Sequence, residues 1–302
     1  MLLQLATIFI NVITPVFALV VIGYFAGSRL ELDPRTLTRY AYYILIPALI
    51  FNVIASAQVE VGLATRMIIF ALVVHVALAG VGWGVARALR RPEKMVSAYI
   101  LIAVFGNVGN FGLPLIEFRL GKEAFAAATV YFLAIMTIAF IIGVAAANLP
   151  SGGGLKATLA VFKTPALIAL VPAVIANAYD IQPPLFLERI IGLLAAATIP
   201  TMLVALGVQL STLKSFNFTS DVIIASGIRL LAGPALAILL AVPFGLTGIE
   251  RGAGIFQAAM PAAVLTAIIA MEYDLIPEFV TTTVLFSTLA SVITLTLVMA
   301  LV

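Results

Sequence analysis

Long apolar runs constrain this chain more than any other feature of its sequence. Apart from Arg229, these runs contain no Asp, Glu, Lys or Arg. A helix needs roughly 20 mostly apolar residues to cross a bilayer, whereas the strands of a membrane β-barrel have about 10 residues that alternate between apolar and polar. The runs therefore predict an all-α polytopic membrane protein with ten transmembrane helices. They are residues 1–28, 40–59, 67–86, 95–116, 124–155, 164–179, 190–213, 222–249, 252–271 and 279–302.

The composition excludes several classes of protein and of site. Only 10% of the 302 residues are charged, whereas soluble domains average about 25%. The absence of cysteine excludes disulfides and thiolate chemistry, and a single histidine without an acidic cluster argues against a metal centre. We therefore expect no metal, no cofactor and no nucleic-acid partner, with membrane lipid as the surroundings. We do not expect an enzyme, because the spans hold no paired carboxylates, Ser/Lys pair or histidine-rich set.

The distribution of lysine and arginine predicts the orientation of the chain. Cytoplasmic loops of membrane proteins are enriched in these two residues. With the N-terminus outside, ten of them fall in cytoplasmic loops and five in outer loops, and Arg229 lies within a span. We therefore expect both the N-terminus and the C-terminus on the outer side of the membrane.

A short glycine-rich stretch divides the chain into two similar halves. We expect a first five-helix repeat in residues 1–147, a cytoplasmic link in residues 148–157 and a second repeat in residues 158–302. Because each half has an odd number of helices, the second half enters from the opposite side, which gives a 5+5 inverted repeat. Matching prolines support the repeat, although chance pairing among 15 prolines is an alternative. The matches are Pro15 with Pro172, 157 apart, Pro47 with Pro200, 153 apart, and Pro114 with Pro261, 147 apart.

The fourth and ninth predicted helices contain residues that interrupt helices. Residues 106–114 hold three glycines, two asparagines and a proline, and residues 252–261 end in Met260 and Pro261. Glycine and proline are the poorest helix formers, and proline disfavours helical angles in the residue before it. Interrupted helices at equivalent places in two repeats point to the binding site of a transporter. The alternative is that the glycines only allow close packing of helices.

Each interruption leaves the N-terminus of a half-helix deep in the membrane. Such an end has free N–H donors and about half a positive charge, so two of them together favour a bound anion. Neutral amide side chains would add further donors. The candidates for substrate binding in these segments are Asn107, Asn110, Gly112, Pro114, Gln257, Met260 and Pro261.

Four polar residues elsewhere are further candidates. Asn52 in the second span faces either the substrate or a neighbouring helix. A charge inside the membrane is functional by default, so Arg229 balances a substrate carboxylate, pairs with Glu117, or forms a structural ion pair. His75 either carries a coupled proton or only satisfies a hydrogen bond. Because Glu117 is the only acid near either interruption, we favour a proton over sodium as the coupling ion.

Several short motifs follow one another in a fixed order. They are Pro15-Val16-Phe17, Tyr42 to Phe51, Asn107 to Pro114, Ile199-Pro200 with Leu206-Gly207, Arg229 to Pro234, Ala259 to Ala263, and Ser287-Thr288-Leu289. In this order the motifs resemble the auxin efflux carrier family over essentially the whole chain, in particular its bacterial malonate and malate permease-like members. The resemblance implies a protein of the bacterial cytoplasmic membrane. Plant members have a long cytoplasmic loop where this chain has a short link, so regulation through that loop is not expected.

The resemblance also implies a fold similar to that of bile acid symporters and sodium/proton antiporters. In that fold, helices 1, 2, 6 and 7 form a scaffold through which two copies form a homodimer. Helices 3, 4, 5, 8, 9 and 10 form a core that moves against the scaffold like an elevator. The fourth and ninth helices cross at their prolines, here Pro114 and Pro261, and the substrate lies beside the crossing.

The expected function is secondary active transport of a small organic anion, a mono- or dicarboxylate such as malonate, malate or auxin. The alternative is a sodium- or proton-coupled carrier or antiporter of the same fold for a cation or a steroid-like substrate. Cation antiporters need an intramembrane Asp near the crossing, and this chain has none there. A channel would show repeated polar rings along a pore, whereas the polar residues here gather at two interruptions.

Overall fold

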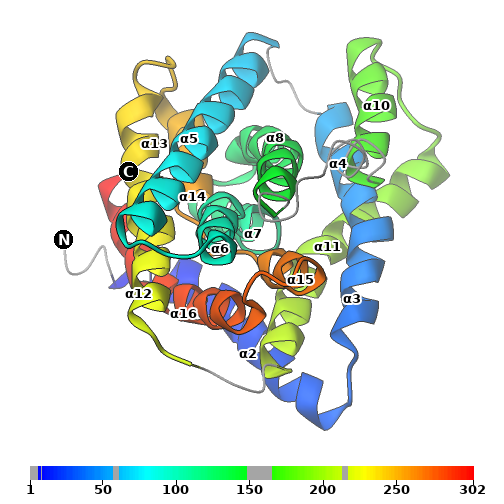
Figure 1. Cartoon of the computed structure of the whole chain (residues 1–302). Coiled ribbons are helices and arrows are strands. Elements are labelled where there is room, and N and C mark those ends of the chain that lie inside the picture. Colours follow the sequence, from blue (N-terminus) through cyan, green and yellow to red (C-terminus); the bar gives the residue numbers. More distant parts are fainter. Residues whose placement is uncertain (1–5, 8, 57–60, 148–164, 213–216) are drawn as a thin grey trace.

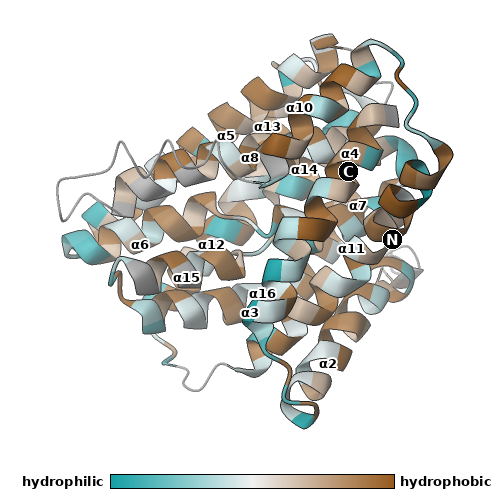
Figure 2. Cartoon of the chain, turned by 90° about the vertical axis from the view of Figure 1, so that its right-hand side faces the viewer, coloured by the Kyte–Doolittle hydropathy of each residue, from teal (hydrophilic) through white to brown (hydrophobic). Residues whose placement is uncertain are grey.

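The computed structural model describes residues 6–7, 9–56, 61–147, 165–212 and 217–302. Each of the ten apolar stretches contains helix within these residues, and the only strand-like feature among them is an isolated bridge. Among the described helices, six are long and apolar enough to cross a membrane, judged by length and composition. Hydrophobic residues cover much of the outer surface of the helices (Figure 2). The predicted link at 148–157 lies outside the described residues.

The helices alternate with short π-helical turns, which are wider than α-helical turns and are labelled η. The first half contains η1 Phe9–Ile13, α2 Thr14–Arg29, α3 Pro34–Tyr40, η2 Ala41–Leu45, α4 Ile46–Ser56, α5 Val61–Ala88, α6 Glu93–Val104, η3 Val108–Gly112, α7 Leu113–Leu120 and α8 Lys122–Ala147. The second half contains α10 Pro165–Ala178, α11 Leu185–Ser211, α12 Ser220–Gly227, η5 Ile228–Ala232, α13 Gly233–Ala241, α14 Gly248–Ala258, α15 Val264–Glu272 and α16 Pro277–Leu301.

The helices form two groups that lie side by side (Figure 1). In one group, α2 packs along α11, and α4 packs against α10 and α11. In the other group, α5, α6, α8 and α14 pack around one another, with α12, α15 and α16 against them. We call these the α11 group and the α6 group. Contacts of α11 with η3 and of α4 with α8 join the two groups.

Within the α11 group, α2 and α11 approach each other backbone to backbone. A Cβ atom added to Gly207 would lie 1.9 Å from the carbonyl oxygen of Val20. One added to Gly23 would lie 2.2 Å from the carbonyl oxygen of Val204. Small residues allow helices to approach this closely in membranes, so the two glycines set the distance between α2 and α11.

Each of the four π-helical turns in the described residues ends two residues before a proline. Proline lacks an N–H, and its ring clashes with the carbonyl four residues earlier in an α-helix. A wider turn relieves this clash, so the helix continues past the proline. The turns end at Ile13, Leu45, Gly112 and Ala232, before Pro15, Pro47, Pro114 and Pro234.

Both predicted interruptions are present. α6 ends at Val104, and helical structure resumes at Val108. α14 ends at Ala258, and α15 begins at Val264. The two interrupted helices lie near the centre of the α6 group in Figure 1. Each is therefore divided into two half-helices at the middle of the molecule.

The two interruptions contact each other through their backbones. The N–H of Asn107 donates to the carbonyl of Pro261 over 2.8 Å. The N–H of Ala263 donates to the carbonyl of Phe105, also over 2.8 Å. These two hydrogen bonds form an antiparallel bridge centred on Gly106. The extended segments thereby satisfy backbone groups that have no water to bind at this depth.

The crossing differs from the prediction in one respect. Pro261 lies at the crossing, but Pro114 follows η3 in the first turn of α7. Helical structure has already begun at Val108, and the π-helical turn η3 accommodates the proline without a break. The prediction that Pro114 forms the crossing is therefore wrong, and Gly106 occupies that place.

Candidate functional site

Arg229 in η5 is fully buried against the crossing. Its Nε donates to the carbonyl of Met260 over 2.7 Å, its Nη1 to that of Ala103 over 2.8 Å and its Nη2 to that of Ala258 over 3.0 Å. Ala103 and Ala258 lie in the last turns of α6 and α14, where carbonyls have no partner within the helix. Arg229 therefore binds the C-terminal ends of both interrupted helices.

The predicted pair between Arg229 and Glu117 is absent. Neither residue takes part in an ion pair within the described ranges, where the pairs are Arg87–Glu93, Arg91–Asp221 and Lys94–Asp274. Backbone carbonyls, and no carboxylate, receive the three hydrogen bonds of the guanidinium. Of the alternatives for Arg229, the pair with Glu117 is therefore wrong.

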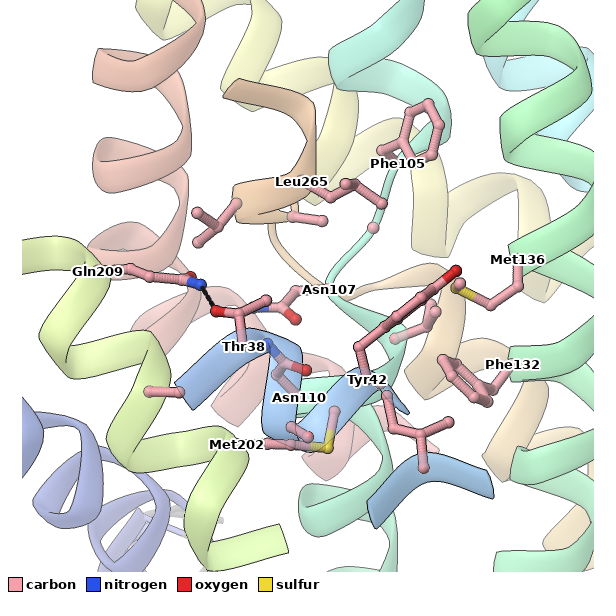
Figure 3. A pocket seen from close by; sticks show the side chains of 18 of the residues that line it. Thr38, Tyr42, Phe105, Asn107, Asn110, Phe132, Met136, Met202, Gln209 and Leu265 are labelled. Carbon is pink, nitrogen blue, oxygen red and sulfur yellow. Dashed lines mark hydrogen bonds between the residues drawn. The ribbon is translucent and has the colours of Figure 1, made fainter. Parts of the chain in front are cut away.

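A cavity of about 370 Å³ adjoins the crossing at the boundary between the two helix groups. We call it the crossing cavity. Residues of α3, η2 and α11 line it from the α11 group, and residues of the first interruption, η3, α8 and α15 line it from the α6 group. Asn107 and Asn110 lie near its centre in Figure 3, close to Thr38. Two predicted site residues, Asn107 and Asn110, therefore line one cavity.

Both half-helix N-termini lie at the crossing cavity. Residues 108–110 begin η3, Val264 and Leu265 begin α15, and all of them line the wall. The N–H groups in the first turn of a helix have no partner within the helix and carry partial positive charge. The four half-helix ends at the crossing are therefore separated by their partial charge. The negative ends contact Arg229, and the positive ends line the cavity.

Polar side chains add hydrogen-bonding capacity to this cavity. Asn107 is only 4% exposed, and its Nδ2 has no hydrogen-bond partner among the described residues. A buried donor without a partner costs about 1–3 kcal/mol, which a bound acceptor would recover. Gln209 donates from Nε2 to Thr38 Oγ1 (Figure 3), and the exposed Arg39 also lines the wall. The polar part of the cavity thus suits a negatively charged group.

The remaining wall of the crossing cavity is apolar. Aromatic and methionine side chains surround the space beside the asparagines (Figure 3). A cavity with a few polar groups in an apolar lining is typical of sites for small molecules. The side chains that form this wall are Tyr42, Phe105, Phe132, Met136, Met202 and Leu265.

A second cavity, of about 630 Å³, also lies at the boundary between the helix groups. Its wall includes residues of α2, α4 and α11 on one side and of α7 and α8 on the other. Asn52, Glu117 and Lys122 are its polar residues. Asn52, which we predicted as a substrate-binding residue, therefore lies in a different cavity from Asn107 and Asn110. The same holds for Glu117.

The other predicted residues of the interruptions are buried and do not line the crossing cavity. Gln257 is fully buried, and its Nε2 donates to the carbonyl of Ala128 over 3.1 Å. A Cβ added to Gly112 would lie 2.1 Å from Gln257 Oε1, so this glycine makes room for the glutamine. Contact with the cavity is absent for Gly112, Pro114, Gln257, Met260 and Pro261.

His75 in α5 is fully buried and lines neither cavity. Its Nδ1 lies 3.0 Å from the carbonyl oxygen of Ala71, which can only accept a hydrogen bond. Its ring packs edge-on against Tyr131, with the ring centroids 5.8 Å apart. The structure thus surrounds this histidine with α5 and α8.

Most of the residues that line the crossing cavity were not predicted, and three of them are polar or aromatic residues near the start of the second apolar run. Thr38, Arg39 and Tyr42 lie on α3 and η2, at the start of the second apolar run, where polar side chains are typical of a loop. Thr38 and Tyr42 are four residues apart and so lie on one face of a continuous helix. That spacing is the signal that could have identified them.

Comparisons with known proteins agree with this picture. The family model described as "Membrane transport protein" matches residues 8–158 and 154–299. An "Uncharacterized transporter" of Methanothermobacter thermautotrophicus is 25% identical over 93% of this chain and 94% of its own length. A "Putative malonate transporter" of Rhizobium meliloti is 25% identical over 95% of this chain and 93% of its own length. "Auxin efflux carrier component 3a" of Oryza sativa is 27% identical over 41% of this chain and 20% of its own length.

The family match covers nearly the whole chain, and the described helices include six that are long and apolar enough to span a membrane. The motifs that resemble auxin efflux carriers agree with both findings. The chain is an integral membrane transporter and belongs to the auxin efflux carrier family of membrane transport proteins.

Proposed function

We propose that this protein is a secondary active transporter for a small organic anion, a mono- or dicarboxylate. The main support is the crossing cavity, where two half-helix N-termini and the unpaired amide of Asn107 present N–H donors. The lining residues include Arg39 but no Asp or Glu. A carboxylate bound there gains charge-assisted hydrogen bonds without facing a like charge.

The lining of the crossing cavity suggests how dicarboxylates and monocarboxylates would bind in different ways. One carboxylate of the anion binds at Asn107 and the two helix N-termini. For a dicarboxylate such as malonate or malate, the second carboxylate turns toward Arg39 at the wall. For a monocarboxylate with a ring, such as auxin, the ring rests on Phe132 and the methionines. The relative named for malonate supports the first arrangement.

We further propose ten transmembrane helices in a 5+5 inverted repeat, with halves at residues 1–147 and 158–302. The six long apolar helices, the shorter Thr14–Arg29 and Ile168–Ala178, and the two interrupted helices support this count. Both termini lie outside the bacterial cytoplasmic membrane. The α11 group is the scaffold of a homodimer, and the α6 group is the core. Two cavities at one boundary support movement of the core as an elevator.

The alternative is a carrier of the same fold for a cation or a steroid-like substrate. A cation site deep in the membrane needs carboxylates or other oxygen ligands aimed at the ion. The oxygen atoms of side chains in the crossing cavity belong to neutral amides and hydroxyls, among them the unpaired Oε1 of Gln209, and no carboxylate lines it. A volume of about 370 Å³ is also small for a steroid nucleus with its side chain. Both features favour the anion.

The test is a thermal-shift screen combined with uptake into proteoliposomes. We expect malonate, malate or indole-3-acetate to raise the melting temperature and to be transported, because each offers a carboxylate to the helix N-termini. Matched amines and a bile acid serve as controls for charge and for size. A melting temperature that rises only with the amines or the bile acid would contradict the proposal.

Proton coupling through His75 is a separate prediction from the sequence. We expect His75→Gln to keep the pH dependence of wild-type transport, because the ring lines neither cavity and its Nδ1 is bound to Ala71. The measurement is the initial uptake rate of the best anion from pH 5 to pH 8. A flat pH profile for the variant beside a sloping wild-type profile would show instead that His75 carries the coupled proton.

A further inference from the structure

The buried guanidinium of Arg229 lies where the structure concentrates backbone carbonyls. Three carbonyl oxygens, of Ala103, Ala258 and Met260, accept hydrogen bonds from its three nitrogens over 2.7 to 3.0 Å. Two of them end α6 and α14, and the third belongs to the second interruption. The side chain thus joins both interrupted helices by their C-terminal ends.

The positive charge of Arg229 is balanced by the partial negative charges of two helix C-termini. Each helix C-terminus carries about half a negative charge, so two C-termini together offset the single positive charge of a guanidinium. No carboxylate pairs with Arg229 among the residues that the structure describes. A buried charge of this kind is stable only when it is bound and compensated. The carbonyls at the crossing therefore compensate the buried charge of Arg229, which in turn supplies them with hydrogen-bond donors.

In carriers with interrupted helices, unwound carbonyls and half-helix C-termini are the groups that coordinate a coupling cation such as sodium. In this protein the guanidinium of Arg229 already binds the corresponding carbonyls. The fit leaves no spare room, because a Cβ added to Gly106 would lie 2.3 Å from Nη2 of Arg229. In the described part of the chain, no group of three or more His, Cys, Asp or Glu residues is placed so that it could hold a metal ion.

We propose that Arg229 is the built-in cation of the crossing, replacing a coupling sodium ion, and that anion transport is therefore independent of sodium. Arg229 is a positioning residue, since it does not line the crossing cavity. By holding the C-termini of α6 and α14, it keeps the opposite half-helices aimed at the substrate. This inference rests on the proposed function, and it predicts that removing the side chain leaves a vacant site for a small cation.

The first experiment uses the wild-type protein and needs no variant. Uptake of the best anion is measured in proteoliposomes with sodium, potassium or N-methyl-D-glucamine as the only cation, at equal membrane potential. We expect initial rates that agree within about twofold, a difference of less than 1 kcal/mol. A rate that collapses without sodium would overturn the proposal.

The second experiment vacates the site. We expect Arg229→Ala to lower both uptake and melting temperature, with uptake reduced by about tenfold or more, because three buried carbonyls lose their partners. Millimolar guanidinium should restore both quantities by filling the vacated space. Arg229→Met is the matched control, because its long neutral side chain fills the space without charge and guanidinium should not restore it.

The melting temperature separates this inference from the proposed function. It is measured without any substrate, so stabilisation of Arg229→Ala by guanidinium is observable even if no anion is transported. If guanidinium stabilises Arg229→Met as strongly as Arg229→Ala, or if Arg229→Ala transports at the wild-type rate without added cation, Arg229 is not the cation of the crossing.

Discussion

Replacing Asn107 by Asp is expected to slow anion transport by roughly a hundredfold or more while leaving the protein folded. The change preserves the shape of the side chain but turns an unpaired amide donor in the crossing cavity into a carboxylate. Two like charges about 4 Å apart repel by about 4 kcal/mol at an effective dielectric constant of 20. The new carboxylate also interacts favourably with the partial positive charge of the helix N-termini, and this interaction stabilises the folded protein.

The measurement is uptake into proteoliposomes, with melting temperature as the check on folding. Asn217→Asp is the matched control, because it makes the same chemical change at an exposed residue just before α12 that lines neither cavity. It should transport at close to the wild-type rate. Wild-type transport by Asn107→Asp at neutral pH would exclude the crossing cavity as the anion site.

The second large effect is expected from Gly207→Ala, which should lower the free energy of unfolding by about 3 kcal/mol or more. The added methyl would lie 1.9 Å from the carbonyl oxygen of Val20 and 2.7 Å from the backbone nitrogen of Tyr24. Backbone atoms cannot turn aside as a side chain can, so α2 and α11 must separate along their whole contact. The loss is measured as a lower melting temperature in detergent.

Gly192→Ala provides the control for this prediction. Gly192 lies in the same helix, α11, but nothing lies within 4 Å of a Cβ added there. Alanine favours helix over glycine by up to about 1 kcal/mol, so this variant should be as stable as the wild type or slightly more stable. If both variants lose stability equally, the contact between α2 and α11 is not the cause.

The sequence predicts the fold where the signal is a long pattern. Ten apolar stretches all contain helix, and both interruptions occur in the predicted helices. The place of Pro114 was predicted wrongly, because proline is the strongest local signal of a break, whereas a π-helical turn accommodates Pro114 and the helix is interrupted between Val104 and Val108. The separation of equivalent residues in the two repeats identifies the crossing better than the prolines do. Gly106 and Ala262 are 156 residues apart, close to the 157 and 153 of the other proline pairs.

The candidate site was predicted only in part, because sequence does not reveal which face of an interrupted helix meets a cavity. Asn107 and Asn110 line it, whereas Gln257 is turned toward α8. The partners of Arg229 were missed for another reason. A buried guanidinium suggests an acidic partner, but Arg229 binds backbone carbonyls, and every residue has one. Only the fold shows which carbonyls are left without partners.

Backbone pairing and one guanidinium join both interrupted helices at the crossing. In the proposed elevator, the two half-helix N-termini and Asn107 would move together with the α6 group, so they would meet the first carboxylate in the same way on either side of the membrane. Arg39 belongs to α3 and would stay with the scaffold. Import and export would then share the contacts of the first carboxylate, and a directional bias would come from groups that do not move, such as Arg39.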